Sequence, residues 1–375
     1  MQILSVGEAY RTFAYANILA VLVGVFYQFK ASDSLVGFQW VKYLVLFTFG
    51  FFVIHFIAVQ NLVIIKEMRH ILIAAFLVVG IYMLDSEKES YVRRNIFNLV
   101  LVIIFTYVAS QIISLWLFNK PYGTAKNPHY LALFSSVSII VALYCFLKAS
   151  TIKLKSFIGG CILLLGGLLI HSLSRPAWIG LILAGLLITF FLTRKQQLYT
   201  ASTIVLILLM LMVTNVGGFA DRSNDIIENV RTEERVTIWQ DTWRMQTDSS
   251  VAQWAVGHGL RSFEESFKSY SAYHKKGSDF NSPHNYVLEL LFISGVLGLS
   301  LALTLFWLLY KGLIKALKLK DEDEGIYVML IAILTSSTIL TSITLPFFSS
   351  NSMNIIAVVV GVILYLRKIS ESSYG

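Results

Sequence analysis

Long apolar stretches alternate with short polar ones along most of this 375-residue chain. A helix that crosses a bilayer needs about 20 mainly apolar residues, because each residue adds about 1.5 Å and the hydrocarbon core is about 30 Å thick. The pattern therefore predicts an all-α polytopic membrane protein, with about 11 to 12 transmembrane helices in a single membrane domain, 1–375. The spans predicted directly are 10–29, 39–60, 69–85, 96–118, 129–148, 156–174, 176–193, 198–216, 286–310, 326–345 and 352–367.

One long polar segment, 217–285, interrupts this pattern. Between Ile227 and Met245 its apolar residues are mixed with Glu and Arg, which predicts one or two short amphipathic helices. A turn at 257–259 and a second short helix are expected to follow. We therefore expect an extracytoplasmic loop, inserted between transmembrane helices and carrying short helices of its own.

The lysines and arginines of the short loops predict which face is cytoplasmic. If the spans alternate, most of these residues fall on one face, and the segment 217–285 falls on the opposite, outer face. Lys66 and Arg69 fall on the outer face in this scheme. Either a span in the first quarter of the chain is placed differently, or these two residues are interfacial. The residues that define the cytoplasmic face are Arg93, Arg94, Lys153, Lys155, Arg194, Lys195, Lys311, Lys320, Arg367 and Lys368.

The composition agrees with a membrane protein. Hydrophobic residues make up 56% of the chain and charged residues 14%, against about 25% charged residues in soluble domains. The net charge of +8 is attributed to loops that set topology, so no nucleic acid partner is expected. Cys145 and Cys161 fall in apolar spans and are interpreted as small buried hydrophobes. We expect no metal, no cofactor, and a first span that directs the chain to the membrane without a cleavable signal peptide.

His284 stands where the polar segment gives way to the apolar span 286–310, and Asn285 follows it. The position predicts a histidine at the membrane boundary that faces water. A base at this place can act on a lipid-carried substrate with a water-soluble head. A neutral histidine, with an ordinary pKa of about 6.5, can take a proton from an acceptor hydroxyl. The alternative is an interfacial histidine that only caps a helix.

Arginines on the predicted outer face form a second group of candidates. Arg175 lies between two spans with almost no loop, and a charged residue at membrane depth is a functional candidate by default; snorkelling to head groups is the alternative. Arg231 and Arg235 are spaced i, i+4, so they can share a helix face and clamp a pyrophosphate. Glu233 and Glu234 lie between them and leave surface ion pairing open. The same segment carries Arg222, Arg244 and Arg261.

The chemistry that these residues predict needs no metal. We identify no metal site of the Asp-x-Asp type and no nucleotide-binding loop, because the acidic run Asp321–Glu324 follows the Lys-rich end of a span and is interpreted as a solvated cytoplasmic loop. The outer face lacks nucleotide sugars, so a sugar donor there arrives linked to lipid. Together these points favour metal-independent glycosyl transfer, with arginines stabilising a pyrophosphate leaving group. The turn Gly257-His258-Gly259 either brings backbone N–H groups close to a ligand or is an ordinary turn.

The motifs around His284 and Arg175 resemble those of the O-antigen ligase superfamily, which also contains polysaccharide polymerases and protein O-oligosaccharyltransferases. Members share His, then Asn, Ser or Gln, nine further residues, and Gly-x-x-Gly or a variant ending in Thr or Tyr. Here His284-Asn285 is followed, after nine residues, by Gly295-Val296-Leu297-Gly298. The family also has an Arg-x-x-x-Leu element after a Ser, often written Ser-Arg-Gly-Ala-Trp. The stretch that resembles it is Ser174-Arg175-Pro176-Ala177-Trp178-Ile179, with Pro176 in place of the usual Gly and Ile179 in place of the Leu.

Two weaker elements occur in the family's order. Arg235 and Trp239, followed by Gly257-His258-Gly259-Leu260-Arg261-Ser262-Phe263, resemble a pattern of Arg, Trp, then Gly-x-Gly-x-x-Ser-Phe. Asn127-Pro128 resembles an Asn-Pro element ahead of a span. The likeness covers roughly residues 120–310.

The resemblance implies an inverting glycosyltransferase of the bacterial inner membrane, multi-pass, with its active site on the periplasmic face. Its donor would be a glycan on undecaprenyl pyrophosphate. The base would be His284. The residues that would bind the pyrophosphate are Arg175, Arg235 and Arg231. The residues that would support the site are Asn285, Gly295, Gly298 and Arg261.

The acceptor leaves several functions open. Our first interpretation is an O-antigen ligase, which transfers the glycan to lipid A-core. The alternative is an O-antigen or capsular polysaccharide polymerase, which uses a second lipid-linked repeat as acceptor. A protein glycan transferase is less favoured, because such proteins usually carry larger extra domains. A non-enzymatic lipid or glycan transporter is the other class. A transporter places ionisable residues near the midplane of broken spans, whereas here the arginines cluster at one surface, which favours an enzyme surrounded by membrane lipids.

Overall fold

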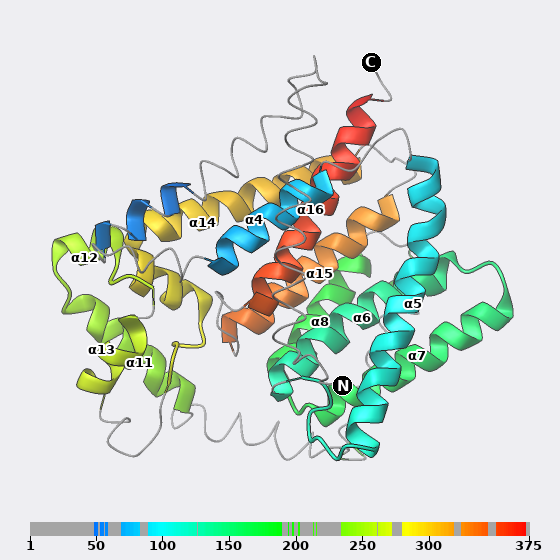
Figure 1. The fold of residues 1–375 in the computed structure, drawn as a ribbon, viewed down its shortest axis with the longest axis horizontal. Helices are drawn as coiled ribbons and strands as arrows, with labels where there is room; N and C mark the ends of the chain where they lie inside the picture. The colour runs from blue at the N-terminus through cyan, green and yellow to red at the C-terminus, as the bar shows by residue number, and fades with distance from the viewer. Residues whose placement is uncertain are drawn as a thin grey trace, which may run out of the picture. The chain divides into compact units, whose positions relative to one another are not determined.

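The structure is a computed structural model in which every regular element of the described residues is an α-helix (Figure 1). The described residues are 49–51, 53–55, 57–58, 69–82, 89–125, 127–189, 194, 197–198, 202, 213, 215, 234–260, 262–271, 280–318, 324–343 and 350–372. They fall into two compact units. The first unit is Met1–Glu89, Asp241–Gly312 and Pro346–Gly375, and the second is Ser90–Gln240 and Leu313–Leu345.

The predicted all-α polytopic membrane fold is confirmed. Four helices of the described part are long and apolar enough to cross a bilayer: Pro128–Lys148, Ile152–His171, Tyr286–Lys311 and Gly325–Ile343. Shorter apolar helices cover Val100–Trp116, Arg175–Thr189 and Met353–Tyr365. The elements that contain these stretches are α5 (Glu89–Trp116), α6 (Pro128–Lys148), α7 (Ile152–His171), α8 (Arg175–Thr189), α14 (Tyr286–Lys318), α15 (Glu324–Ile343) and α16 (Ser350–Ser372). The predicted spans 10–29, 39–60 and 198–216 lie wholly or mostly outside the described residues.

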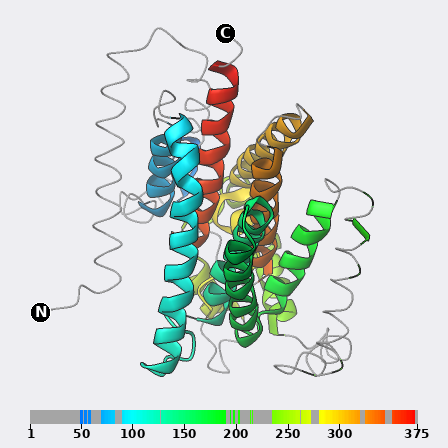
Figure 2. The same ribbon diagram turned by 90° about the vertical axis from the view of Figure 1, so that its right-hand side faces the viewer.

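In the second unit, α15 packs along α8 and α6, and α6 packs along α7, while α5 runs as one continuous helix (Figure 2). The contact between α8 and α15 is close because Gly180 has no side chain. A Cβ there would lie 2.9 Å from the carbonyl oxygen of Ser336. Helix α6 begins where the Asn127 side chain accepts a hydrogen bond from the N–H of Tyr130 and Pro128 occupies the first turn.

In the first unit, α4 (Arg69–Tyr82) lies along α16, far from it in sequence (Figures 1 and 2). Gly361 of α16 faces Ile81 of α4, and a Cβ at Gly361 would lie 2.9 Å from the Cβ of Ile81. Helix α14 is interrupted at Gly295, whose φ of 63° and ψ of −170° are not helical. The turns before this interruption bury Leu290 and Phe292 almost completely, so the start of α14 is anchored in the core of its unit.

The polar segment contains three described helices: α11 (Glu234–Thr247), α12 (Val251–Val256) and α13 (Ser262–Tyr270). A capping box between Ser250 and Gln253 starts α12. Helix α13 is amphipathic and buries Phe263 and Phe267. Helix α11 covers the described part of the stretch from Ile227 to Met245, where short helices were predicted, and α13 is the second short helix expected after the turn; residues 227–233 lie outside the described residues.

Candidate functional site

The site is built at the first turn of α14. The Asn285 side chain accepts hydrogen bonds from the N–H groups of Val287 (3.1 Å) and Leu288 (3.2 Å), so it is the N-cap of the helix. His284, one residue earlier, has a φ of 51°. Such a φ is uncommon for a residue other than glycine, and such conformations cluster at functional sites. The cap is therefore made by Asn285, and His284 is held in a conformation that capping does not require.

The imidazole of His284 contacts Ser282 and Phe280. The Ser282 side chain is 3% exposed, and its Oγ accepts a hydrogen bond of 3.4 Å from the backbone N–H of His284. The same Oγ lies 3.4 Å from Nδ1 of the ring. Phe280 meets the ring edge to face, with centroids 6.2 Å apart and planes at 85°. One ring nitrogen thus faces a buried hydroxyl, while the residue as a whole is half-buried.

The two glycines of the sequence motif have separate roles. Gly295 interrupts α14 and lies against the loop at Gly257, where a Cβ on either glycine would meet backbone atoms at 2.3 to 2.6 Å. Both have positive φ, 63° for Gly295 and 78° for Gly257, a region that glycine adopts without strain. A Cβ at Gly298, one turn further along α14, would meet the Ser294 side chain at 2.3 Å. The motif therefore lets a loop and a helix cross backbone to backbone.

The turn 257–259 binds α14. The N–H of His258 donates to the carbonyl of Phe292, and the N–H of Gly259 donates to the carbonyl of Ile293, both at 2.9 Å. The alternative that these N–H groups bind a ligand is therefore wrong, because α14 already accepts both hydrogen bonds. The imidazole of His258 also stacks on the ring of Phe292, with centroids 4.2 Å apart.

The hydrogen bonds of the His258 ring define its tautomer. The Ser249 hydroxyl donates to the Met245 carbonyl at 2.7 Å, so its Oγ accepts the bond of 2.8 Å from Nε2–H of His258. Nδ1 then accepts from the Gln253 amide nitrogen, 3.3 Å away. Burial lowers the pKa of His258 from its ordinary value. The ring is neutral and both of its nitrogens are hydrogen-bonded, which fits a structural role for His258.

Arg175 is the first residue of α8 and is half-buried. The turn before it is very short, with Leu173 at a φ of 53° and a buried Ser174 whose Oγ lies 3.2 Å from Nδ1 of His129. On the other side, the indole N–H of Trp178 donates to the Leu169 carbonyl at 3.3 Å. The structure thus shows the sharp junction that the sequence predicts. Arg175 belongs to the second unit and His284 to the first.

The other arginines are only partly described. Arg235 is the second residue of α11, half-buried, and is also in the second unit. Arg231 and Arg261 lie outside the described residues, as does Arg222, so the predicted i, i+4 pair stays a prediction. Arg244, further along α11, is exposed and lies 3.8 Å from a carboxylate oxygen of Asp241. In the described part of the chain, no three His, Cys, Asp or Glu side chains form a cluster that could hold a metal ion.

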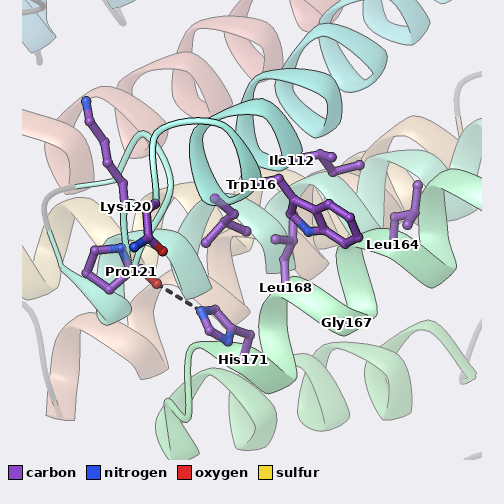
Figure 3. A pocket seen from close by; sticks show the side chains of 10 residues that line it. Ile112, Trp116, Lys120, Pro121, Leu164, Gly167, Leu168 and His171 are labelled. Carbon is purple, nitrogen blue, oxygen red and sulfur yellow. Dashed lines mark hydrogen bonds between the residues drawn. The ribbon is translucent and has the colours of Figure 1, made fainter.

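A separate groove of about 450 Å³ lies in the second unit, between the ends of α5 and α7 (Figure 3). Its walls are mainly apolar, with Trp116, Leu164 and Leu168 beside one another. The Nε2 atom of His171 lies 2.8 Å from the Pro121 carbonyl, whereas the Lys120 side chain extends away from the groove. The groove thus offers apolar surface, and its one histidine is engaged by the backbone.

Sequence reasoning missed Ser282 and Phe280. Ser282 left a local signal, since a serine hydroxyl commonly accepts a hydrogen bond from the N–H two residues later, and that residue is His284. Phe280 has no local sequence signal, because its position depends on a contact with Phe267 of α13, whose ring it meets edge to face at 5.9 Å.

These features define a membrane-embedded helical protein with a histidine held at the start of an interrupted helix. Residues 160–303 match the family model described as O-antigen ligase. The resemblance to the O-antigen ligase superfamily is therefore confirmed over this stretch, and a function of the ligase or polymerase kind is supported. The matched residues include Arg175, Arg235, His284 and both motif glycines. No curated protein matches the chain.

Proposed function

We propose that this protein is an inverting glycosyltransferase of the bacterial inner membrane. It transfers O-antigen polysaccharide from undecaprenyl pyrophosphate to lipid A-core, without a metal, on the periplasmic side. The observation that carries the proposal is the placement of His284, half-buried at the head of α14 with one ring nitrogen facing a buried hydroxyl. The ligase-family match over 160–303 supports the same class and favours an enzyme over a transporter.

In the proposed reaction His284 is the general base. It takes the proton from an acceptor hydroxyl while the hydroxyl oxygen bonds to the anomeric carbon of the donor. The bond from that carbon to the pyrophosphate oxygen breaks, and undecaprenyl pyrophosphate leaves with the electron pair. Attack from the face opposite the leaving group inverts the anomeric centre. General base catalysis of this kind contributes about 10²- to 10⁴-fold to a rate.

The arginines are proposed to stabilise the leaving group. Arg175, Arg235 and Arg231 would bind the pyrophosphate, because a guanidinium stays charged and offers a planar pair of donors to phosphate oxygens. Arg261 would support them. We also propose that the segment 217–285 lies at the periplasmic face, where the glycan head of the donor is exposed to water, within a single membrane domain.

The acceptor separates the two enzyme functions. Purified protein is reconstituted with undecaprenyl-pyrophosphate-linked glycan and offered lipid A-core or a second lipid-linked repeat, with EDTA present. Glycan on lipid A-core would establish the metal-independent ligase. Growth of the lipid-linked chain would identify a polymerase instead. No transfer to either acceptor, with folded protein and intact donor, would contradict both.

A further inference from the structure

The apolar groove of the second unit lies between two helices of the membrane domain. Helix α7 is long and apolar enough to span the bilayer, and Val100–Trp116 of α5 is a shorter apolar stretch. The two helices meet at Phe105 and Phe157, whose ring centroids are 5.7 Å apart. Toward their C-terminal ends they leave the groove of about 450 Å³. Because the bilayer core contains no water, the occupant that this groove meets there is an apolar chain.

The groove has a length that suits part of one acyl chain. Its wall on α7 runs from Leu164 to His171, and these residues cover about 10 Å of helix. This length is about a third of the hydrocarbon thickness, so the groove fits within one leaflet. Trp116, on the α5 side, is 85% exposed, and exposed tryptophans are typical of the head-group level. The groove therefore ends where the head of a phospholipid begins.

Positive charge stands at this end of the groove. Lys120 belongs to the loop between α5 and α6, and its side chain extends away from the apolar walls (Figure 3). Its backbone N–H donates to the Ser114 carbonyl and its carbonyl accepts from the N–H of Gly123, both at 3.1 Å. The sequence has no Asp or Glu between Glu89 and Asp221. An anionic head group therefore finds a cation on a held backbone and meets no carboxylate from residues 90–220.

Hydrogen bonds fasten the loop to both helices. At the end of α7, Nε2–H of His171 donates to the Pro121 carbonyl at 2.8 Å, since a carbonyl oxygen can only accept. On α5, the Gln111 side-chain oxygen accepts from the N–H of Thr124 at 3.0 Å, and the Gln111 amide nitrogen donates to the Thr124 hydroxyl. The apolar walls and the lysine are thus parts of one preformed structure.

We propose that this groove binds one acyl chain of an anionic phospholipid, whose phosphate interacts with Lys120. A polyprenyl phosphate offers the same chemistry, an apolar chain with a phosphate at its end. The short groove favours the phospholipid, because an acyl chain stays within one leaflet, whereas an undecaprenyl chain is several times longer than the groove. The bound chain supplies dispersion contacts that the exposed walls lack and so stabilises the contact between α5 and α7. The proposal does not depend on the activity of the protein.

A glycine in the wall allows the groove to be filled by substitution. Gly167 lines the groove, and a Cβ added there meets no atom within 4 Å. Gly167→Leu therefore puts a side chain into the groove without displacing the backbone. Gly160→Leu is the matched control. Gly160 is also exposed, has the same open space at its Cβ, and lies about two turns earlier on the same face of α7, outside the groove.

Native mass spectrometry of the purified protein in detergent, with added palmitoyl-oleoyl phosphatidylglycerol, counts the bound lipid and gives its affinity. Gly167→Leu should bind one phosphatidylglycerol fewer than the wild type, and Gly160→Leu should bind the wild-type number. Lys120→Ala should bind that lipid about fivefold more weakly, and Lys120→Arg should bind it as the wild type does. Phosphatidylethanolamine, with the same chains and no net charge, should bind the wild type more weakly than phosphatidylglycerol does.

Each arm of the experiment has an outcome that contradicts the proposal. Equal phosphatidylglycerol binding by Gly167→Leu and Gly160→Leu would show that the lipid does not occupy the groove. Wild-type affinity in Lys120→Ala would exclude the phosphate contact, and this variant leaves the groove unfilled. Displacement of the phosphatidylglycerol by an equal concentration of undecaprenyl phosphate would identify a prenyl site instead. Unfolding midpoints measured without lipid should agree for the two leucine variants.

Discussion

The crossing of Gly257 and Gly295 allows a sharp prediction for Gly257→Ala. A Cβ at Gly257 would lie 2.4 Å from the carbonyl carbon of Ile293 and the nitrogen of Ser294. Ordinary contacts of a Cβ begin near 3.4 Å, so the two backbones must separate by about 1 Å, the difference between these distances. That separation loosens the bonds from His258 and Gly259 to α14.

The cost can be worked out from these contacts. Each of the two lost hydrogen bonds contributes about 0.5–1.5 kcal/mol. The φ of 78° and ψ of −171° at Gly257 belong to a region used almost only by glycine, which adds about 1–3 kcal/mol for alanine. The substitution should therefore destabilise the contact between the loop and α14 by about 2–6 kcal/mol.

Thermal unfolding in detergent, followed by tryptophan fluorescence, measures this effect. Trp254 of α12 meets Trp243 of α11 edge to face at 6.1 Å, so the signal reports on this segment. Gly257→Ala should lower the midpoint by several degrees and reduce transfer. The matched control is Gly166→Ala in α7, where an added Cβ meets nothing within 4 Å and helix stability rises by about 0.5–1 kcal/mol. A wild-type midpoint in Gly257→Ala would refute the reasoning.

Three further predictions follow from the site. Arg175→Ala should lower the initial transfer rate about a hundredfold, and Arg175→Lys should recover only part of that rate, because a point charge lacks the bidentate fork. The control is Arg244→Ala, on the exposed face of α11. Full activity in Arg175→Ala would exclude the pyrophosphate role. Asn285→Ala should lower the unfolding midpoint, because it loses about 1 kcal/mol of helix capping, whereas Asn285→Ser should keep the wild-type midpoint. Equal midpoints for the two variants would contradict the capping role of Asn285. The pKa of His258 is lower in the folded protein than in the unfolded chain, so as the pH falls the unfolded chain takes up the proton first. The stability that neutral His258 contributes is therefore present above about pH 6.5 and is lost as the pH falls toward the pKa of the folded state. Unfolding midpoints at pH 7.5 and 5.5 should differ less in His258→Gln than in the wild type.

For the residues that the structure describes, the hydrophobic pattern predicted the helices well, because lipid-facing and core-facing residues are both apolar and hydropathy detects both. It was less able to place their ends. Helix α5 begins at Glu89, seven residues before the predicted span 96–118, since its first turns are polar and hydropathy does not register them. The interruption of α14 was also missed, because Gly295 lies inside an apolar run and only its backbone angles reveal it.

The candidate site was predictable where the signal is local. His284 and Asn285 stand at a boundary between polar and apolar sequence, and that boundary is the start of α14. The role of His258 was not predictable, because its partners include Phe292 of α14, which is distant in the chain. Phe280 escaped notice for the same reason, since its contact with α13 exists only in the folded protein.

The most direct test of the central claim compares wild type, His284→Ala and His284→Gln in the reconstituted transfer assay. Initial rates with undecaprenyl-pyrophosphate-linked glycan are measured together with unfolding midpoints and donor binding. The account predicts that both variants lose about 10²- to 10⁴-fold in rate while they remain folded and still bind the donor. Transfer at the wild-type rate by folded His284→Ala would contradict it.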